Sequence, residues 1–298
     1  MIFEATNAAD KRAKLRQSLR DGKLLQFPGA FSPFVALMAT ELGFDGIYIS
    51  GSTIASDLGL PDIGLTTQSE VVQRGRAIAN VTALPSIIDI DTGFGEPMNV
   101  ARTVRELEQL GLAGCHLEDQ ANPKRCGHLD NKELVAVDQM TKKLRAAADI
   151  RADKNFLLIG RTDARAEEGV AKAIDRAKAY VDAGADVIFP EALQNISEFE
   201  QFRKAISAPL LANMTEFGKS PLLSKTELEG VGFNIAIYPV TAFRLAMKAV
   251  EDGFRTLQAQ GSQAALVPQM QTRARLYEVL KYESYNRFDQ KLFNFKLP

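Results

Sequence analysis

The segment 124–128, with the sequence Lys-Arg-Cys-Gly-His, places one thiol among three side chains that can carry positive charge. The acids Glu118 and Asp119 precede it closely. The thiolate is the reactive form of cysteine, and nearby positive charge stabilises it, so the composition predicts a lowered pKa for Cys126. The alternative is a solvated basic turn that happens to contain a cysteine. The segment by itself leaves both interpretations open.

Two pairs of polar residues follow apolar runs with a spacing of two. Asp89 and Asp91 form one pair, and His116 and Glu118 form the other. Residues two apart on a strand share a face, so each pair points one way. Carboxylates without a cysteine or histidine cluster suit a hard cation such as Mg²⁺ and disfavour zinc. The pattern therefore predicts a magnesium site and favours Asp91 as the direct ligand, although an aspartate here can also cap the following loop.

Arg161 lies at the end of another apolar run and has the residue type that clamps a substrate carboxylate. Its planar fork binds a carboxylate bidentately, which lysine cannot do. The alternative is a structural ion pair with Glu191 or Asp163. Cys115, inside an apolar run beside His116, is expected to face the core.

Short apolar runs, which must position these groups, alternate with amphipathic segments along most of the chain. Most of the runs show no alternation, which is typical of parallel strands buried on both faces. The predicted strands lie at 24–31, 46–52, 85–91, 113–119, 156–163, 187–191, 209–214 and 233–238. The polar residues gather at their carboxyl ends, where a barrel carries its chemistry.

Helical patterns lie between these strands, at 100–110, 132–148, 169–183 and 196–206. Strands separated by helices over this length predict one α/β domain, a (β/α)₈ TIM-like barrel, with an open doubly wound sheet as the alternative. Further helical patterns at 241–252 and 269–285 have no strand after them. We expect a single domain over 1–298, in which 241–298 is a C-terminal helical extension that packs on a neighbouring subunit.

The composition excludes several classes of protein. A chain of 298 residues with 46% hydrophobic and 24% charged residues is typical of a soluble globular protein. Its net charge of −1 offers no electrostatic surface for nucleic acid or an anionic membrane. No apolar run approaches the roughly 20 residues that span a bilayer, and residues 1–5 do not have a secretory pattern. Its two cysteines cannot form a disulfide framework and fit a reducing cytoplasm.

Together these residues resemble the isocitrate lyase and phosphoenolpyruvate mutase superfamily, whose lyase members carry the Lys-Arg-Cys-Gly-His loop. The resemblance runs in order from about residue 20 to about residue 285. The further matching segments are YISG at 48–51, LPD at 60–62, DIDTGFG at 89–95, HLEDQ at 116–120, RTDA at 161–164, FPEA at 189–192, NMTEFG at 213–218 and QTR at 271–273. The compact length is similar to that of the methylisocitrate-cleaving members, because isocitrate lyases proper carry long insertions.

The resemblance implies Mg²⁺-dependent cleavage of the tricarboxylate 2-methylisocitrate to pyruvate and succinate, in the 2-methylcitrate cycle of propionate breakdown, with Mn²⁺ as a possible substitute. It also implies a homotetramer in which the eighth helix of the barrel swaps between subunits. Asp89 and Asp91 would hold the metal, with Glu118 nearby. The residues that would contact substrate are Ser50, Gly51, Ser52, Cys126, Gly127, Arg161, Glu191, Asn213, Met214, Thr215, Arg244 and Arg273. Ser52 departs from the family, which often has glycine there.

The chemistry of this cleavage assigns further roles. Retro-aldol cleavage needs a base for the C2 hydroxyl and an acid for the succinate carbanion. Cys126 is the expected acid; Arg125 and His128 are expected to tune its pKa, and Lys124 to help bind the substrate or relay a proton. The base stays open between Tyr48, Asp62 and a metal-bound hydroxide.

Two further expectations concern the walls of the site. The loop 119–132 follows the fourth strand and is expected to act as a lid that excludes water. An apolar pocket for the 2-methyl group is expected from Phe189, Ile237, Pro239 and Val240.

Other functions remain open at this point. An oxaloacetate decarboxylase or a phosphonomutase of the same superfamily generally lacks the Cys-Gly-His segment, whereas a dimethylmalate lyase shares its cysteine. Outside enzymes, the alternatives are a non-catalytic barrel that binds a dicarboxylate and a thiol sensor in which Cys126 is oxidised.

Overall fold

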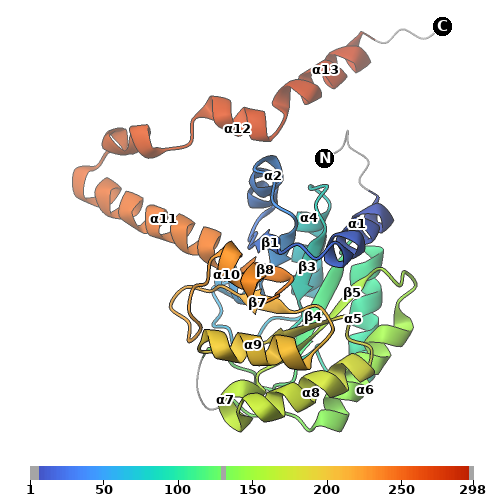
Figure 1. Cartoon of the computed structure of the whole chain (residues 1–298). Helices are drawn as coiled ribbons and strands as arrows, with labels where there is room; N and C mark the ends of the chain where they lie inside the picture. Colours follow the sequence, from blue (N-terminus) through green and yellow to red (C-terminus); the bar gives the residue numbers. More distant parts are fainter. Residues whose placement is uncertain (1–6, 129–131, 295–298) are drawn as a thin grey trace, which may run out of the picture.

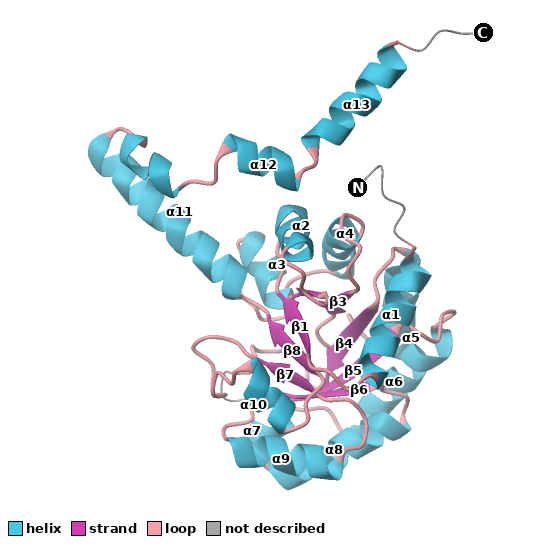
Figure 2. Cartoon of the chain, turned by 45° about the horizontal axis from the view of Figure 1, so that its top comes forward, coloured by secondary structure: helices cyan, strands magenta, loops and turns pink. Residues whose placement is uncertain are grey.

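A computed structural model describes residues 7–128 and 132–294 of the chain. Parallel strands lie at the centre of the molecule and helices surround them (Figures 1 and 2). The strands are β1 (Leu25–Pro28), β2 (Ile47–Ile49), β3 (Ser86–Asp89), β4 (Gly114–Glu118), β5 (Leu157–Thr162), β6 (Val187–Pro190), β7 (Leu211–Asn213) and β8 (Ile235–Tyr238). Each one falls inside a predicted strand, and all but β8 end earlier, because the chain bends into the loops that carry the polar residues.

The strands close into a ring. One ladder has the order β1-β8-β7 and the other the order β2-β3-β4-β5-β6. Isolated parallel bridges, Gly29 to Tyr48 and Ile188 to Leu210, join the two ladders at both seams. The predicted (β/α)₈ barrel is therefore confirmed, and the open doubly wound sheet is excluded.

Alternate residues of each strand serve two separate cores. On β5, Leu157 and Ile159 belong to the cluster inside the barrel, whereas Leu158 belongs to the layer between strands and helices. Leu15 and Leu19 of the first helix fill the end of the inner cluster. Burial on both sides explains why these strands read as continuous apolar runs.

The helices lie around the barrel and beyond it (Figure 1). They are α1 (Ala8–Arg20), α2 (Pro33–Glu41), α3 (Gly51–Asp57), α4 (Gln68–Ala79), α5 (Pro97–Gln109), α6 (Val137–Ile150), α7 (Ala164–Glu168), α8 (Val170–Asp182), α9 (Ile196–Ala205), α10 (Lys225–Gly230), α11 (Thr241–Gln260), the 3₁₀ turn η1 (Ala264–Gln269), α12 (Arg273–Val279) and α13 (Tyr282–Phe293).

The structure corrects three sequence predictions. The predicted helix 132–148 begins instead at Val137, because residues 133–135 use their backbone to pair with residues 119–121. The predicted strand 46–52 ends at Ile49, and the Ser50 turn leads into α3. The predicted helix 269–285 is broken between α12 and α13 at Lys281, whose φ is 52°. Three stretches for which the sequence made expectations lie outside the described residues: residues 1–5, residues 129–131 of the loop 119–132, and residues 295–298 of the extension 241–298.

The C-terminal helices leave the barrel (Figure 1). α11 projects away from the strands and buries none of its residues. Its residues Met247, Val250, Phe254 and Leu257 are spaced by three or four, so they form one apolar stripe, and all four are exposed. α12 turns back onto α2 of the same chain, where Arg275 Nη1 lies 2.7 Å from Glu41 Oε1.

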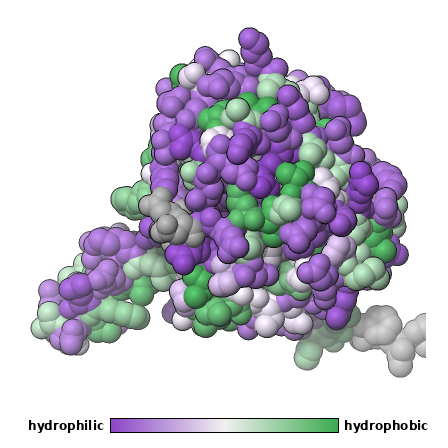
Figure 3. Space-filling model, turned by 90° about the horizontal axis from the view of Figure 1, so that it is seen from below, coloured by the Kyte–Doolittle hydropathy of each residue, from purple (hydrophilic) through white to green (hydrophobic). Residues whose placement is uncertain are grey.

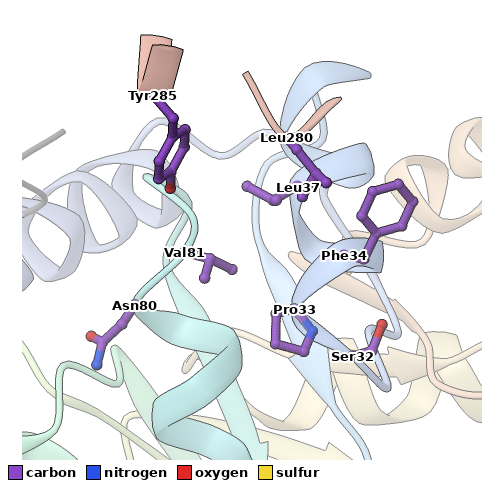
Figure 4. A pocket seen from close by; sticks show the side chains of 8 residues that line it. All are labelled: Ser32, Pro33, Phe34, Leu37, Asn80, Val81, Leu280 and Tyr285. Carbon is purple, nitrogen blue, oxygen red and sulfur yellow. The ribbon is translucent and has the colours of Figure 1, made fainter. Parts of the chain in front are cut away.

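A cavity of about 590 Å³ lies where this tail returns to the barrel. In Figure 4, Leu280 of the tail appears beside Leu37 of α2, and Tyr285 of the tail lies on the side opposite Phe34. The lining is mostly apolar, and its polar members are Ser32, Asn80 and Tyr285. On the face shown in Figure 3, apolar residues are scattered among hydrophilic ones. None of the described helices combines the length and the apolarity that crossing a bilayer requires.

Candidate active site

A small polar cavity lies at the carboxyl ends of the strands. Its volume is about 80 Å³, far less than that of the cavity beneath the tail, but nearly every residue around it can bind or transfer a charge or a proton. The lining consists of Tyr48, Ser50, Ser52, Asp62, Asp89, Lys124, Cys126, Gly127, His128, Arg161, Glu191, Asn213, Thr215, Pro239, Val240 and Arg244. Convergent polar groups of this kind locate an active site better than volume does.

Three buried carboxylates stand beside this cavity. Asp89 accepts hydrogen bonds from the backbone of Gly51 at 3.2 Å and of Asp91 at 2.9 Å. Burial, reinforced by the charge of Asp89, raises the pKa of Asp91 to about 6. Burial likewise raises the pKa of Glu118 well above its usual range. Asp91 Oδ1 and Glu118 Oε1 are buried and have no hydrogen-bond donor.

Lys124 places its ammonium among these acids. It pairs with Asp62 and lies 2.7 Å from Asp91 Oδ1, an ion pair that lacks hydrogen-bond geometry. Burial alone would lower the pKa of Lys124, but the carboxylates of Glu118, Asp91 and Asp62 raise it well above its usual value. The lysine therefore stays charged, and its ammonium forms ion pairs with Asp62 and Asp91 rather than stabilising a thiolate at Cys126.

The donor set fits a hard divalent cation. Asp89, Asp91 and Glu118 supply only oxygen; Glu118 Oε1 has no hydrogen-bond partner, and Asp91 Oδ1 contacts only the ammonium of Lys124, so the cluster can accept one more positive charge. Among the described residues, no three His, Cys, Asp or Glu side chains come close enough to hold an ion by themselves. Mg²⁺ does not need such a cluster, because it keeps several waters and takes one or two carboxylates.

Arg161 is buried and fixed by acids on several sides. Its Nε and Nη2 bind Asp163 in a fork at 2.9 and 3.1 Å. Its Nη1 lies 3.2 Å from Glu118 and 3.5 Å from Glu191. Burial would raise the pKa of Glu191, but the charge of Arg161 holds it well below its usual range. The sequence posed a substrate clamp and a structural ion pair as alternatives, and the geometry gives Arg161 both a cavity position and the ion pairs.

The predicted lowering of the Cys126 pKa is wrong. Burial raises the pKa of this thiol, and the backbone N–H of His128 offsets that only in part. The cations of the segment do not face the sulfur: Lys124 pairs with carboxylates, and Arg125 is exposed. A raised pKa keeps the thiol protonated at neutral pH, which suits an acid better than a nucleophile.

His128 has a defined tautomer. Its Nδ1 accepts the backbone N–H of Lys219 at 2.9 Å, so the ring proton must sit on Nε2. Nε2 lies 2.9 Å from Glu191 Oε1 and donates to it. The ring nitrogens of His128 thus bond to Lys219 and Glu191, and it is the backbone N–H of His128 that lowers the pKa of Cys126.

Both side chains that the sequence offered as the base line the cavity. The hydroxyl of Tyr48 lies 2.8 Å from Nε2 of the buried His116, which itself lies 3.6 Å from Asp89. Burial raises the pKa of Tyr48 well above its usual value and lowers that of His116. Asp62 is the alternative and is held by Lys124.

Some predicted residues lie outside the cavity wall. Gly51 lies just behind it, where an added Cβ would stand 2.9 Å from Asp89 Oδ2. Met214 is buried, and its sulfur accepts the backbone N–H of Leu223. Arg273 is exposed on α12, on the tail. Of the residues expected to hold the 2-methyl group, only Pro239 and Val240 line the cavity, because Phe189 and Ile237 are buried inside the barrel.

Sequence reasoning missed functional neighbours that touch the cavity only through others. His116 was placed on a face with Glu118 but was given no task. Gln120 and Lys132 are buried among polar partners, although a glutamine and a lysine in a charged loop normally indicate solvent. The strand spacing could have found His116, whereas nothing in the sequence distinguishes Lys132 from a surface lysine.

The comparisons with known proteins agree with this geometry. The family model described as phosphoenolpyruvate phosphomutase matches residues 15–258. A probable 2-methylisocitrate lyase of Corynebacterium glutamicum is 54% identical over 99% of this chain and 96% of its own. The 2-methylisocitrate lyase of Bacillus subtilis is 44% identical over 100% of this chain and 98% of its own.

Solved structures of related enzymes share the fold. An oxaloacetate acetylhydrolase with the inhibitor 3,3-difluorooxalacetate superposes with a TM-score of 0.91 at 34% identity, over 97% of this chain and 99% of its own. A 2,3-dimethylmalate lyase gives 0.90 at 31% identity, over 99% and 100%. A phosphonopyruvate hydrolase with oxalate and Mg²⁺ gives 0.87 at 30% identity, over 95% and 99%.

Proposed function

The chain belongs to the phosphoenolpyruvate phosphomutase family, within the wider isocitrate lyase superfamily, and we propose that it is a carbon–carbon lyase that cleaves 2-methylisocitrate to pyruvate and succinate. The observation that carries the proposal is that Cys126, a thiol whose pKa is raised by burial, lies in one cavity with Arg161 and Asp89. This retro-aldol cleavage requires an acid, a cationic group that binds the substrate carboxylates, and carboxylates that can bind a divalent cation. The reaction would serve propionate breakdown in the cytoplasm.

The charges of the cavity suit a tricarboxylate substrate. Arg161 and Arg244 line it, together with the amide of Asn213 and the hydroxyls of Ser50 and Thr215. Arg244 is less fixed than Arg161, since its Nε lies 3.7 Å from Glu216 and its side chain is half exposed. Asp163 occupies the Nε–Nη2 fork of Arg161, so Arg161 would attract a substrate carboxylate mainly by its charge, whereas Arg244 would bind one with its fork in a defined orientation. Pro239 and Val240 would contact its 2-methyl group.

The bond between C2 and C3 breaks when the C2 hydroxyl loses its proton and the electron pair moves to C3. Asp62 or Tyr48 takes this proton; Tyr48 would first have to pass its own proton to His116, a transfer that the raised pKa of Tyr48 and the lowered pKa of His116 oppose. Cys126 then gives its thiol proton to the succinate carbanion, and the thiolate recovers a proton afterwards. A divalent cation bound at Asp89 and Asp91 would stabilise the negative charge on the oxygen that becomes the pyruvate carbonyl.

A cavity of about 80 Å³ is too small for this substrate, since ligand pockets usually measure roughly 300 Å³ or more. Residues 124–128 form much of its wall. We propose that this part of the loop withdraws to admit the substrate and returns to exclude water. Residues 129–131 of the same loop lie outside the described residues.

Metal binding supplies one test. Asp91→Asn should weaken Mg²⁺ binding by more than about tenfold, because even outer-shell partners of metal ligands contribute that much. Isothermal titration of Mg²⁺ measures the dissociation constant without relying on turnover. Asp138→Asn, on an exposed position of α6, is the matched control and should bind Mg²⁺ as the unmodified protein does. Equal affinity in the two variants would rule out Asp91 as a ligand.

The exposed stripe on α11 supports assembly with further copies of this chain. Phe254 is 69% exposed, and burying such a side chain is worth about 1.5–3 kcal/mol. We propose a homotetramer in which α11 packs on a neighbouring barrel. Light scattering after size exclusion should give four times the mass of one chain, and Phe254→Asp should reduce it. Met98→Asp, at an exposed residue of α5, is the control. A monomeric unmodified protein would contradict the proposal.

A substrate panel tests the activity. Pyruvate release should be fastest from 2-methylisocitrate, with isocitrate, 2,3-dimethylmalate and oxaloacetate as competitors. A 2,3-dimethylmalate lyase is the second candidate, since a structure of that enzyme superposes over nearly the whole chain. Preference for dimethylmalate would reassign the substrate, and preference for oxaloacetate would assign a decarboxylase or hydrolase instead.

A further inference from the structure

Cys126 lies between two peptide groups that side chains from outside its turn hold in place. On one side, Gln120 brackets Arg125: its Nε2 donates to the carbonyl at 2.9 Å, and its Oε1 accepts the backbone N–H at 2.8 Å. On the other side, the ammonium of Lys132 donates to the carbonyl of Gly127. With the loop closed, the backbone is thus held immediately before and immediately after the thiol.

Lys132 connects the turn to the substrate clamp. Its side chain is fully buried, and its Nζ lies 3.0 Å from Asp163 Oδ1. Asp163 is the carboxylate that holds Arg161 in a fork. The backbone N–H of Asp163 donates to Asp119 at 2.9 Å, which anchors this residue in turn. Lys132 does not line the cavity; its side chain reaches the cavity through Gly127 and Asp163, and its charge helps to lower the pKa of Glu191.

Both clamping residues come from the base of the loop, where backbone hydrogen bonds join residues 119–121 to residues 133–135: Gln120 lies in this paired segment, and Lys132 lies next to it. Gln120 forms an antiparallel bridge with Leu134. The backbone N–H of Ala121 donates to Glu133 at 2.7 Å, and that of Val135 donates to Asp119 at 2.9 Å. Gln120 and Lys132 therefore hold the turn that carries the thiol in a defined position relative to the barrel strands.

The space around the turn is also tight. A Cβ added to Gly127 would stand 2.6 Å from Glu191 Cγ, so the peptide packs directly on the acid that binds His128. A small shift of this peptide would therefore move the thiol relative to the cavity.

We propose that Gln120 and Lys132 are positioning residues that hold the Cys126 sulfur at its place in the cavity wall for proton transfer. The inference rests on the proposed lyase function. Misplacing a reacting group by about 1 Å can cost about 10²-fold in rate, although no contact with substrate is lost. Neither residue needs to touch the substrate for this effect.

Lys132→Met and Gln120→Met test the inference, with Lys142→Met as the matched control. Lys142 lies on α6 with its side chain 65% exposed and pairs only with Asp138 among the described contacts. Each clamp variant should lower kcat about 10²-fold. KM should stay nearly constant in Gln120→Met, which leaves Asp163 and Arg161 untouched. Iodoacetamide should modify Cys126 faster in both variants than in the unmodified protein, while the buried Cys115 stays unmodified. Mass spectrometry measures the rate of modification at each cysteine.

A folded Gln120→Met or Lys132→Met protein with unchanged kcat and unchanged alkylation would overturn the inference, as would an equal loss in Lys142→Met. If Lys132→Met does not fold, Gln120→Met decides, because it keeps the buried pair of Lys132 and Asp163. Alkylation does not depend on turnover. If the unmodified protein cleaves no 2-methylisocitrate but both variants are alkylated faster than it is, the proposed function is refuted, whereas the role of Gln120 and Lys132 in holding the thiol is supported.

Discussion

Replacing Cys126 with serine should lower kcat by about 10²–10⁴-fold, the range that a positioned general acid contributes. Serine keeps the size of the side chain, but its hydroxyl is a far weaker acid than a thiol, so the succinate carbanion loses its proton source. Mg²⁺-dependent binding of succinate or pyruvate should persist, because Asp89, Asp91 and Arg161 are unchanged. The measurements are steady-state cleavage and ligand titration on the same preparation.

Cys115→Ala is the matched control, because Cys115 is fully buried and faces the layer between strands and helices. It should leave kcat nearly unchanged. A Cys126→Ser protein that turns over at the normal rate would remove the thiol from the mechanism. Loss of Mg²⁺-dependent binding along with turnover would instead indicate a binding role.

The pH profile of the unmodified protein should carry the same signature. The thiol acts as an acid, so kcat should fall as the pH rises through its pKa. Burial raises this pKa, which places the fall above the ordinary value of about 8.5. Cys126→Ser should lose this alkaline limb.

Replacing Arg161 with methionine should lower the free energy of unfolding by about 3–5 kcal/mol and abolish turnover. The guanidinium is buried and faces Asp163, Glu118 and Glu191, so its removal leaves buried carboxylates without their cation. Arg161→Lys should recover part of the stability and little of the activity, because an ammonium cannot form the fork. Urea denaturation and the lyase assay measure the two effects.

Arg275→Met is the control for charge alone, since Arg275 pairs with Glu41 at the surface. It should leave the stability nearly unchanged, as exposed pairs contribute little. Full stability in Arg161→Met would show that the three acids are neutralised by protonation instead.

The sequence was sufficient to predict the barrel because its strands are buried on both faces. Leu157, Leu158 and Ile159 are all apolar, so the run reads as a strand wherever its register falls. The site residues followed from the same pattern, since Asp89, Arg161 and Glu191 lie at or next to the carboxyl ends of β3, β5 and β6. The pattern of strands does not determine the direction in which a loop side chain points.

The prediction for Cys126 failed for that reason. Charge near a residue in sequence was taken as charge near it in space, but Lys124 and His128 face carboxylates. Lys132 was missed for the converse reason, because its burial depends on Asp163, some thirty positions later in the chain. Helix 132–148 was begun too early because the pairing of Gln120 with Leu134 joins segments on opposite sides of a loop.

The most direct test of the lyase function is to incubate the protein with Mg²⁺ and 2-methylisocitrate in D₂O and follow the products by NMR. We expect pyruvate and succinate in equal amounts, with one deuterium from solvent in each succinate, because Cys126 exchanges its thiol proton and delivers it to the carbanion. Unchanged substrate, or products other than these two, would contradict the assignment.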